Sequence, residues 1–412
     1  MRPPGGPGGP GPGMGQGANP MRSGGPGGAG PSGPGVYGVG AVSPGVGVGA
    51  KTDISRLLDA VLKYNASDLH LAVGRPPTVR IRGELHNLGQ TPLTPDDTTT
   101  LMKSITSERH QQDLAERGGA DFGMAYGDKC RFRCSVFKQK QVIGIVLRLI
   151  PNKILSFEEI GLPPVIKDMC MRPRGLCLVT GPTGSGKTTT LATMIDFINV
   201  ERADHIITIE DPIEYYHTHK KCSVTQRELG IDVPGFAEAL KRALRMDPDV
   251  VLVGEMRDLE TIETAITAAE TGHLVFGTLH TTGAAETINR IVDAFPTDRQ
   301  EQIRTMLSAT LISVISQTLL PTADGKGRVA AFEIMFVNDP IKALMRKGET
   351  FKINSHIQTG ANEGMILLDD FLFNLWSNQQ ITYNEMMRRC QDPPSLEKKV
   401  RDYTELMRGR KK

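Results

Sequence analysis

The sequence contains no long apolar segment. No apolar run reaches about 18 residues, the length that a membrane-spanning helix needs, and no signal peptide is visible. We therefore expect a soluble cytoplasmic protein that does not insert into a membrane directly and reaches one only through a partner.

The sequence also lacks any C-x-x-C pair of cysteines. The six cysteines lie at positions 130, 134, 170, 177, 222 and 390, and none forms a C-x-x-C pair, which disfavours a zinc ribbon or a thioredoxin-type site. Residues CRFRC place Cys130 and Cys134 on one face of a predicted strand, but two thiols do not make a metal site. We predict six free thiols in a reducing compartment.

The first 50 residues lack acidic side chains and apolar periodicity. They hold 20 of the 45 glycines, and their only charges are Arg2 and Arg22. Glycine and proline oppose both helix and sheet, so we predict a disordered tail over 1–50. A collagen-like structure is excluded because no strict Gly-X-Y repeat is kept. A flexible extension is favoured over a partner-binding tail.

The chain lacks a basic excess. Its net charge is +2, and because two positive charges lie in the tail, residues 51–412 are neutral. Nucleic-acid proteins usually have a basic bias, and single-strand binders use aromatic stacking platforms, whereas this chain has one tryptophan. We therefore expect no nucleic-acid partner. The basic C-terminal residues Arg408, Arg410, Lys411 and Lys412 are interpreted as a solvated end.

Residues 51–150 predict a small α+β domain. Asp53 precedes an amphipathic helix over 54–64, and a second helix is expected over 94–114. Strands are expected at 67–73, 77–88, 130–139 and 141–150. The segment 151–164 is flanked by prolines and predicts a hinge linker.

From residue 165 the pattern changes to α/β. Short apolar runs at 176–180, 205–210, 250–254 and 274–279 alternate with helical stretches, which predicts a parallel sheet covered by helices on both faces. After Pro340 the sequence becomes mostly helical. We take 165–412 as one domain with a helical C-terminal part.

A phosphate-binding loop follows the first of these strands. Residues GPTGSGKT, 181–188, fit the G-x-x-x-x-G-K-[ST] pattern and open a helix. The glycines let backbone N–H groups surround phosphates, Lys187 reaches the β- and γ-phosphates of ATP, and Thr188 offers its hydroxyl to Mg²⁺. The nucleotide-binding residues are thus Gly181, Pro182, Thr183, Gly184, Ser185, Gly186, Lys187, Thr188 and Thr189.

Acidic residues end two of the predicted strands. Glu210 ends 205–210, and Asp211 and Glu214 follow it. At the end of 250–254, Gly254 occupies the place where nucleotide hydrolases often have an aspartate, and Glu255 comes next. One of Glu210 and Glu255 is expected to hold Mg²⁺ and the other to orient or deprotonate water. For Asp211 and Glu214, a solvated or ion-paired role is equally expected.

Two histidines flank the last predicted strand. His280 lies at its carboxyl end, where ligands bind in such sheets, and we interpret it as a γ-phosphate sensor. His273 lies at the opposite end and is interpreted as structural.

Four motifs together resemble those of the secretion ATPase superfamily: GPTGSGKTT, IITIEDPIE, LRMDPDVVLVGEMRD and TGHLVFGTLHTT. In that superfamily a glycine directly before the glutamate that corresponds to Glu255 is usual. SDLHL, ILSFEEIGLP, SVISQTLLP, GRVAAFEIM and HIQTG are similar to the pilus-retraction (twitching-motility) class. The resemblance implies a RecA-like core, a PAS-like N-terminal domain and a homohexamer with ATP between subunits. It also implies docking on an inner-membrane platform protein and retraction of pilin.

The chain departs from the retraction pattern at three positions. Lys342 and Glu263 each stand where arginine is common, and Phe332 replaces a usual histidine. An accessory or assembly motor of a related pilus or type II secretion system is therefore an alternative, although the tetracysteine motif of extension motors is absent. A RecA-like nucleic-acid translocase is disfavoured by the neutral body.

A nucleotide shared between subunits implies arginine fingers. Arg227 and Arg245 are the candidates, with Arg242 as a third and Arg133 of the N-terminal domain as a further one.

Overall fold

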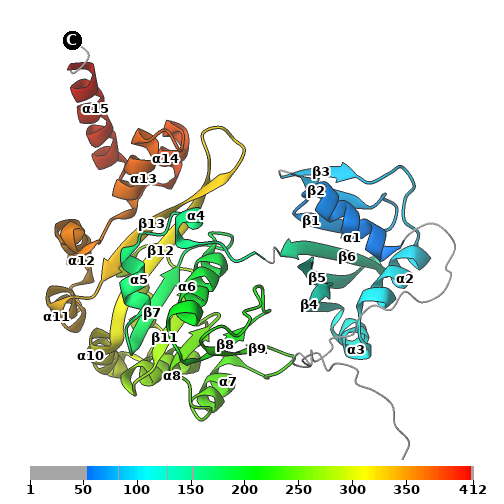
Figure 1. Cartoon of the computed structure of the whole chain (residues 1–412), viewed down its shortest axis with the longest axis horizontal. Coiled ribbons are helices and arrows are strands. Elements are labelled where there is room, and N and C mark those ends of the chain that lie inside the picture. Colours follow the sequence, from blue (N-terminus) through cyan, green and yellow to red (C-terminus); the bar gives the residue numbers. More distant parts are fainter. Residues whose placement is uncertain (1–52, 82, 128, 151–152, 410–412) are drawn as a thin grey trace, which may run out of the picture. The chain divides into compact units, whose positions relative to one another are not determined.

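The computed structural model describes residues 53–81, 83–127, 129–150 and 153–409 (Figure 1). The predicted tail over 1–50 lies outside these residues. No helix in the described part of the chain is long and apolar enough to cross a bilayer. All six cysteines are free thiols, as predicted, and five of them are buried.

The N-terminal domain is built on a six-stranded antiparallel sheet. Its strand order is β3-β2-β1-β6-β5-β4. The strands are β1 Asp68–Leu71, β2 Thr78–Ile81, β3 Glu84–Asn87, β4 Gly119–Tyr126, β5 Cys130–Gln139 and β6 Val142–Ile150. Helix α1 (Ile54–Lys63) begins at the predicted cap, since the Asp53 carboxylate accepts the Ser55 N–H. The domain is α+β, as the sequence indicates.

Two local predictions in this domain were wrong, and one strand was missed. The helix expected over 94–114 is two helices, α2 (Pro95–Ile105) and α3 (Glu108–Arg117), because Ser107 caps the second one by accepting the His110 N–H. The strand expected over 77–88 is the β2–β3 hairpin, in which Gly83 has φ +91°. Strand β4 was not predicted at all; its glycines and alanines hide the alternation.

The second domain is built on a seven-stranded sheet with order β13-β12-β7-β11-β10-β8-β9. The strands are β7 Gly175–Thr180, β8 His205–Glu210, β9 Ser223–Glu228, β10 Val250–Val253, β11 Leu274–Leu279, β12 Leu311–Pro321 and β13 Arg328–Phe336. Strand β11 separates the phosphate-loop strand β7 from β10. The carboxyl ends of β7, β8, β10 and β11 therefore share one edge of the sheet.

Helices cover both faces of this sheet (Figure 1). One apolar core joins β7, β8, β10 and β11 to α7 through α12, and the other joins the opposite face to α5 and α6. The helices are α4 Phe157–Ile160, α5 Val165–Cys170, α6 Lys187–Glu201, α7 Phe236–Ala243, α8 Leu259–Glu270, α9 Ala284–Asp293, α10 Gln300–Thr310, α11 Asp339–Lys347 and α12 Ile353–Thr359.

The sheet is not wholly parallel, because β13 runs antiparallel to β12. These two strands and β9 were not predicted. Polar residues such as Ser313, Ser316 and Gln317 interrupt the apolar run of β12, yet all three are buried.

The C-terminal part is helical, as predicted. Helices α13 (Leu368–Ser377), α14 (Tyr383–Arg389) and α15 (Pro393–Gly409) share a separate apolar core that contains Leu372, Met386 and Leu396.

The second half of the expected linker is packed rather than free. The Thr193 hydroxyl donates to the Leu155 carbonyl at 2.8 Å. Phe157 of α4 and Leu162 are buried in the core beneath α6, and Ser156 caps α4. Residues 155–162 are therefore packed into the second domain and are not free chain.

Candidate active site

The phosphate loop lies at the carboxyl end of β7, and its first glycine is required sterically. Gly181 has φ +140°, and a Cβ there would lie 2.2 Å from the Gln317 carbonyl oxygen of β12. Gly186 has φ +93° and precedes the first residue of α6, Lys187. The loop thus lies directly against β12, and a glycine-rich loop that leads into a helix N-terminus is suited to bind an anion.

The loop is also fastened by a side chain that sequence reasoning missed. The buried Gln317 amide donates to the Ser185 carbonyl at 2.6 Å. The Ser185 hydroxyl and Gln317 Oε1 are buried without a partner among the described residues. No distinct sequence signal pointed to this contact, because Gln317 is one of several polar residues in β12.

Lys187 lies at the start of α6 and points into the loop. Its ammonium group donates to the carbonyls of Gly181 at 2.7 Å and Pro182 at 3.3 Å. Burial lowers its pKa, and the Glu255 carboxylate partly opposes that shift. In the next positions, Thr188 is half-buried, and the Thr189 hydroxyl lies 3.1 Å from the Tyr215 hydroxyl. Pro182, Thr183 and Gly184 are exposed at the loop tip.

The presence of glycine at position 254 also has a steric explanation. A Cβ at this position would lie 3.0 Å from the Ile209 carbonyl oxygen and 3.2 Å from the Glu210 Cα. The Gly254 N–H donates to that same carbonyl at 2.7 Å. An aspartate here would push the ends of β8 and β10 apart. Glycine therefore keeps the two strand ends close and leaves the acid to the next position, Glu255.

Glu210 ends β8 as a buried carboxyl group. Its Oε1 accepts the Thr208 hydroxyl at 2.7 Å and the Gln226 amide at 3.1 Å, while Oε2 accepts no hydrogen bond from the described residues. Burial raises its pKa to about 7, although these two hydrogen bonds oppose the rise, and the nearby Glu214 adds to it. Two hydrogen bonds thus hold Oε1 in place, whereas Oε2 has no donor among the described residues.

Glu255 has the opposite surroundings. Its carboxylate pairs with the Arg257 guanidinium at 2.5 and 2.6 Å, and Oε1 lies 3.0 Å from His280 Nε2. Burial opposes ionisation, but Arg257 and His280 outweigh it, so the pKa of Glu255 is lowered. His280 also places Nδ1 3.5 Å from the Thr183 hydroxyl of the phosphate loop. The structure thus links Glu255, His280 and the loop, and it adds Arg257, which sequence reasoning missed.

The remaining acids and His273 lie outside this set of contacts. Asp211 is exposed and Glu214 is half-buried, and the side chain of neither makes a hydrogen bond to the described residues. His273 Nδ1 lies 2.9 Å from the Ala268 carbonyl of α8, in accord with the structural role expected for it.

The candidate arginine fingers differ in how far they are engaged. Arg242 donates to Glu238 at 2.6 Å, and Arg227 donates to the Asp232 carbonyl at 3.3 Å. Arg245 is exposed and makes no side-chain hydrogen bond to the described residues. Arg133 is exposed on β5 of the N-terminal domain. Within the described chain, Arg245 is thus the freest of the candidates on the second domain.

The three departures from the retraction pattern are accommodated locally. Glu263 of α8 pairs with Arg299 at 2.6 Å, and Lys342 of α11 pairs with Asp339 at 3.1 Å. Phe332 is fully buried in β13 and packs edge-on against Phe371, with 5.5 Å between ring centroids. None of the three touches the phosphate loop.

The described residues contain no cluster of three or more His, Cys, Asp or Glu that would hold a metal by itself. Mg²⁺ in nucleotide sites rarely needs such a cluster, because one or two protein oxygens suffice and phosphates supply others. The side chains of Thr188, Glu210 and Glu255 all offer oxygen atoms at the same edge of the sheet. The residues present therefore fit Mg²⁺ bound with a nucleotide.

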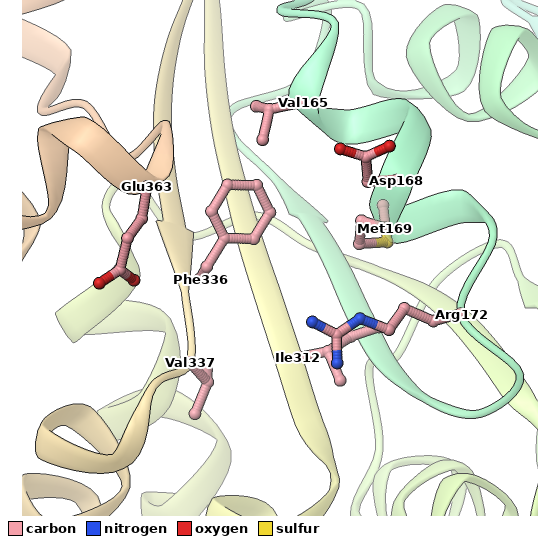
Figure 2. Close-up of a pocket in the computed structure, with 8 residues that line it drawn as sticks. All are labelled: Val165, Asp168, Met169, Arg172, Ile312, Phe336, Val337 and Glu363. Atoms are coloured by element: carbon pink, nitrogen blue, oxygen red, sulfur yellow. The ribbon is translucent and has the colours of Figure 1, made fainter.

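A separate cavity of about 290 Å³ lies among α5, the start of β12 and the end of β13. Figure 2 shows apolar side chains such as Phe336 and Ile312 with two carboxylates, Asp168 and Glu363, and one guanidinium, Arg172. Its acidic groups outnumber its single cation, so it does not suit phosphates.

Comparison with known proteins places the chain among secretion and pilus proteins. The family model described as type II/IV secretion system protein matches residues 50–386. The type IV pilus retraction ATPase PilT of Pseudomonas aeruginosa is 48% identical over 344 residues, which cover 84% of this chain and 100% of that protein. A twitching motility protein of Neisseria gonorrhoeae is 45% identical over 320 residues, 78% of this chain and 86% of that protein.

A solved structure agrees with these relatives. The crystal structure of the pilus retraction motor PilT with bound ADP is 48% identical and has a TM-score of 0.79. The match covers 84% of this chain and 100% of that chain.

Proposed function

Because the chain belongs to the type II/IV secretion system protein family, we propose that it is the motor that powers retraction of type IV pili and hence twitching motility. The chain is an ATPase of this family. The observation that carries the proposal is the likeness to a retraction ATPase over 84% of this chain, together with a phosphate loop and two strand-end glutamates.

The contrast between the two glutamates supports a division of roles. Glu210, with a pKa near 7 and an open Oε2, is the base that takes a proton from the attacking water. Glu255, held ionised by Arg257, would bind Mg²⁺ through water together with Thr188. Bound Mg²⁺ would neutralise phosphate charge. Lys187 contacts the β- and γ-phosphates, and His280 senses the γ-phosphate from its position between Glu255 and Thr183.

The assembly that we propose is a homohexamer at the cytoplasmic face of the inner membrane. ATP would lie between subunits, and the exposed Arg245 would supply the arginine finger. The described parts would act as a PAS-like domain over 53–150 and a RecA-like domain over 155–409. Its partner would be the pilus platform protein, through which pilin is moved indirectly.

One experiment tests the activity at its core. Purified protein should hydrolyse ATP in the presence of Mg²⁺, and Lys187→Ala should abolish turnover because the cation at the phosphates is gone. Lys342→Ala, on α11, is the matched lysine control and should keep the wild-type rate. Unchanged turnover in Lys187→Ala would refute the site, and cells with this variant that still retract pili would refute the motor role.

A second experiment tests sharing of the site between subunits. Arg245→Ala and Glu255→Gln proteins should each be impaired alone. Rings that contain both should regain activity, since one type of interface then has both groups. Absence of recovery in proven mixed rings would exclude Arg245 as a finger in trans and would direct the test to Arg227.

A further inference from the structure

Glu333 of β13 is a buried carboxyl group outside the site described above. Its side chain is 1% exposed, and among the described residues it makes no ion pair with lysine, arginine or histidine. Burial raises the pKa of this carboxyl group, and its hydrogen bonds oppose that rise. A buried carboxyl group without hydrogen-bond partners would be strongly unfavourable. The partners of Glu333 therefore indicate what it does.

Those partners are the starts of two helices. Oε1 accepts the N–H of Ala284, the first residue of α9, at 2.7 Å. Oε2 accepts the N–H of Leu368, the first residue of α13, at 3.4 Å. The first amides of a helix have no partner within it, and the positive end of the helix dipole favours an anion. One carboxylate thus caps two helices that are distant in the sequence.

The first of these helices begins directly after the sensor segment. His280 contacts Glu255 and Thr183, as described above. Three residues later, the Gly283 N–H donates to the Ser316 hydroxyl at 2.9 Å. The segment 280–284 is therefore held by the nucleotide site at one end and by β12 and β13 at the other. A shift of His280 would be transmitted to the start of α9.

The second helix begins the C-terminal helical part. Next to Leu368, the Asp369 carboxylate accepts the N–H groups of Gln391 and Asp392, both at 2.8 Å, just before α15. The Gln391 side chain also hydrogen-bonds to Glu333 and approaches Gly283. The start of α13 thus fixes the start of α15.

We infer that Glu333 is a positioning residue that couples His280 to helices α13 and α15. The inference rests on the proposed function, in which His280 senses the γ-phosphate. If the start of α9 moved while α13 stayed, one carboxylate oxygen would lose its donor in a buried site, which is costly. The two helix starts therefore move as one, and the nucleotide state reaches the C-terminal helices through this carboxylate.

The test uses Glu333→Gln in the full-length protein. The two N–H groups reach different oxygens of Glu333, so in glutamine the remaining oxygen faces one donor and the NH₂ group faces the other, and one helix loses its cap. The phosphate loop is untouched. We expect ADP affinity and KM for ATP within about twofold of wild type and kcat reduced at least about tenfold.

Hydrogen exchange provides the readout that a merely structural role would not change. In wild type, exchange in 368–377 and 393–409 should differ between ADP and a non-hydrolysable ATP analogue. In Glu333→Gln this difference should vanish, while the difference at 181–189 remains. Glu333→Asp keeps the charge but is one methylene shorter, so it should give the same pattern and serves if the glutamine variant does not fold.

The matched control is Thr382→Ala, which removes the cap of α14 without touching Glu333, since the Thr382 hydroxyl accepts the Glu385 N–H. It should lower the melting temperature while keeping kcat and the exchange difference. Wild-type kcat in folded Glu333→Gln and Glu333→Asp, or an equal loss of kcat in Thr382→Ala, would overturn the coupling role. Wild-type protein without ATPase activity would instead overturn the proposed function.

Discussion

The ends of strands β8 and β10 each carry a glutamate, and their surroundings push the two carboxyl groups in opposite directions. At the end of β8, burial raises the pKa of Glu210 to about 7. At the end of β10, Arg257 and His280 lower the pKa of Glu255 despite its partial burial. Two neighbouring acids with separated pKa values are the usual basis for dividing acid–base work from charge stabilisation.

The difference has a structural origin in the strands. Glu210 is followed by a chain that returns as β9, so Gln226 of β9 and Thr208 of β8 enclose it. Glu255 lies in the turn after β10, open on the side where Arg257 and His280 approach. Gly254 lets these two environments lie close together.

Of the two glutamates, Glu210 should give the larger effect when it is replaced. Glu210→Gln keeps the size of the side chain but removes the base, so kcat should fall by about 10³-fold, within the range for general bases. ATP affinity should stay close to wild type, because Lys187 and the phosphate loop are unchanged. Single-turnover kinetics with equilibrium nucleotide binding would measure both. Normal single-turnover hydrolysis would transfer the role of base to Glu255.

Replacing Glu255 should give a smaller effect of another kind. Glu255→Gln should raise the Mg²⁺ concentration needed for half-maximal activity by about 10- to 100-fold, as expected for a carboxylate that holds a metal through water. A Mg²⁺ titration of ATPase activity measures it, with Glu263→Gln on α8 as the matched control. If the Mg²⁺ requirement is unchanged while hydrolysis is lost at all concentrations, Glu255 is not the metal-binding member of the pair.

The comparison also predicts a pH dependence of stability. The pKa of Glu210 is higher in the folded chain, about 7, than its ordinary value of 4.5. Its contribution to the free energy of unfolding is therefore fully present below about pH 4.5 and is lost as the pH rises through 7. Glu210→Gln should remove this loss.

Denaturant unfolding of both proteins at several pH values between 5 and 8 measures that contribution. The glutamine variant should gain stability relative to wild type as the pH rises. A constant difference between the two proteins would show that Glu210 ionises normally in the folded state.

The sequence indicates which residues lie at the shared sheet edge, but it does not divide the roles among them. Glycine spacing, Lys187 and the strand-end positions of Glu210, Glu255 and His280 are local signals, and parallel strands gather their ends at one edge. Which glutamate is buried depends on β9, whose residues SVTQRE carry no strong strand pattern. Contacts of long range, such as those of Gln317 and Glu333, were likewise missed because each is made between segments far apart in the chain.

In the fold, too, local signals were read correctly and other features were missed. Apolar runs such as β8 and β11 were predicted with their observed bounds, because their burial on both faces leaves a continuous signal. The boundary between α2 and α3 was missed, because a capping serine inside a helical pattern is easily read as an exposed helix residue.

The pH profile of kcat in wild type and Thr208→Val tests the assignment of Glu210 most directly. Valine removes the hydroxyl that donates to Oε1 at 2.7 Å, and losing one hydrogen bond to a carboxylate should raise its pKa by about one unit. In wild type, kcat at saturating Mg²⁺ and ATP should rise about tenfold per pH unit below 7 and level off above it. In Thr208→Val the midpoint should move upward with the same plateau. A flat wild-type profile between pH 5.5 and 8, or a midpoint that the substitution leaves in place, would contradict Glu210 as the base.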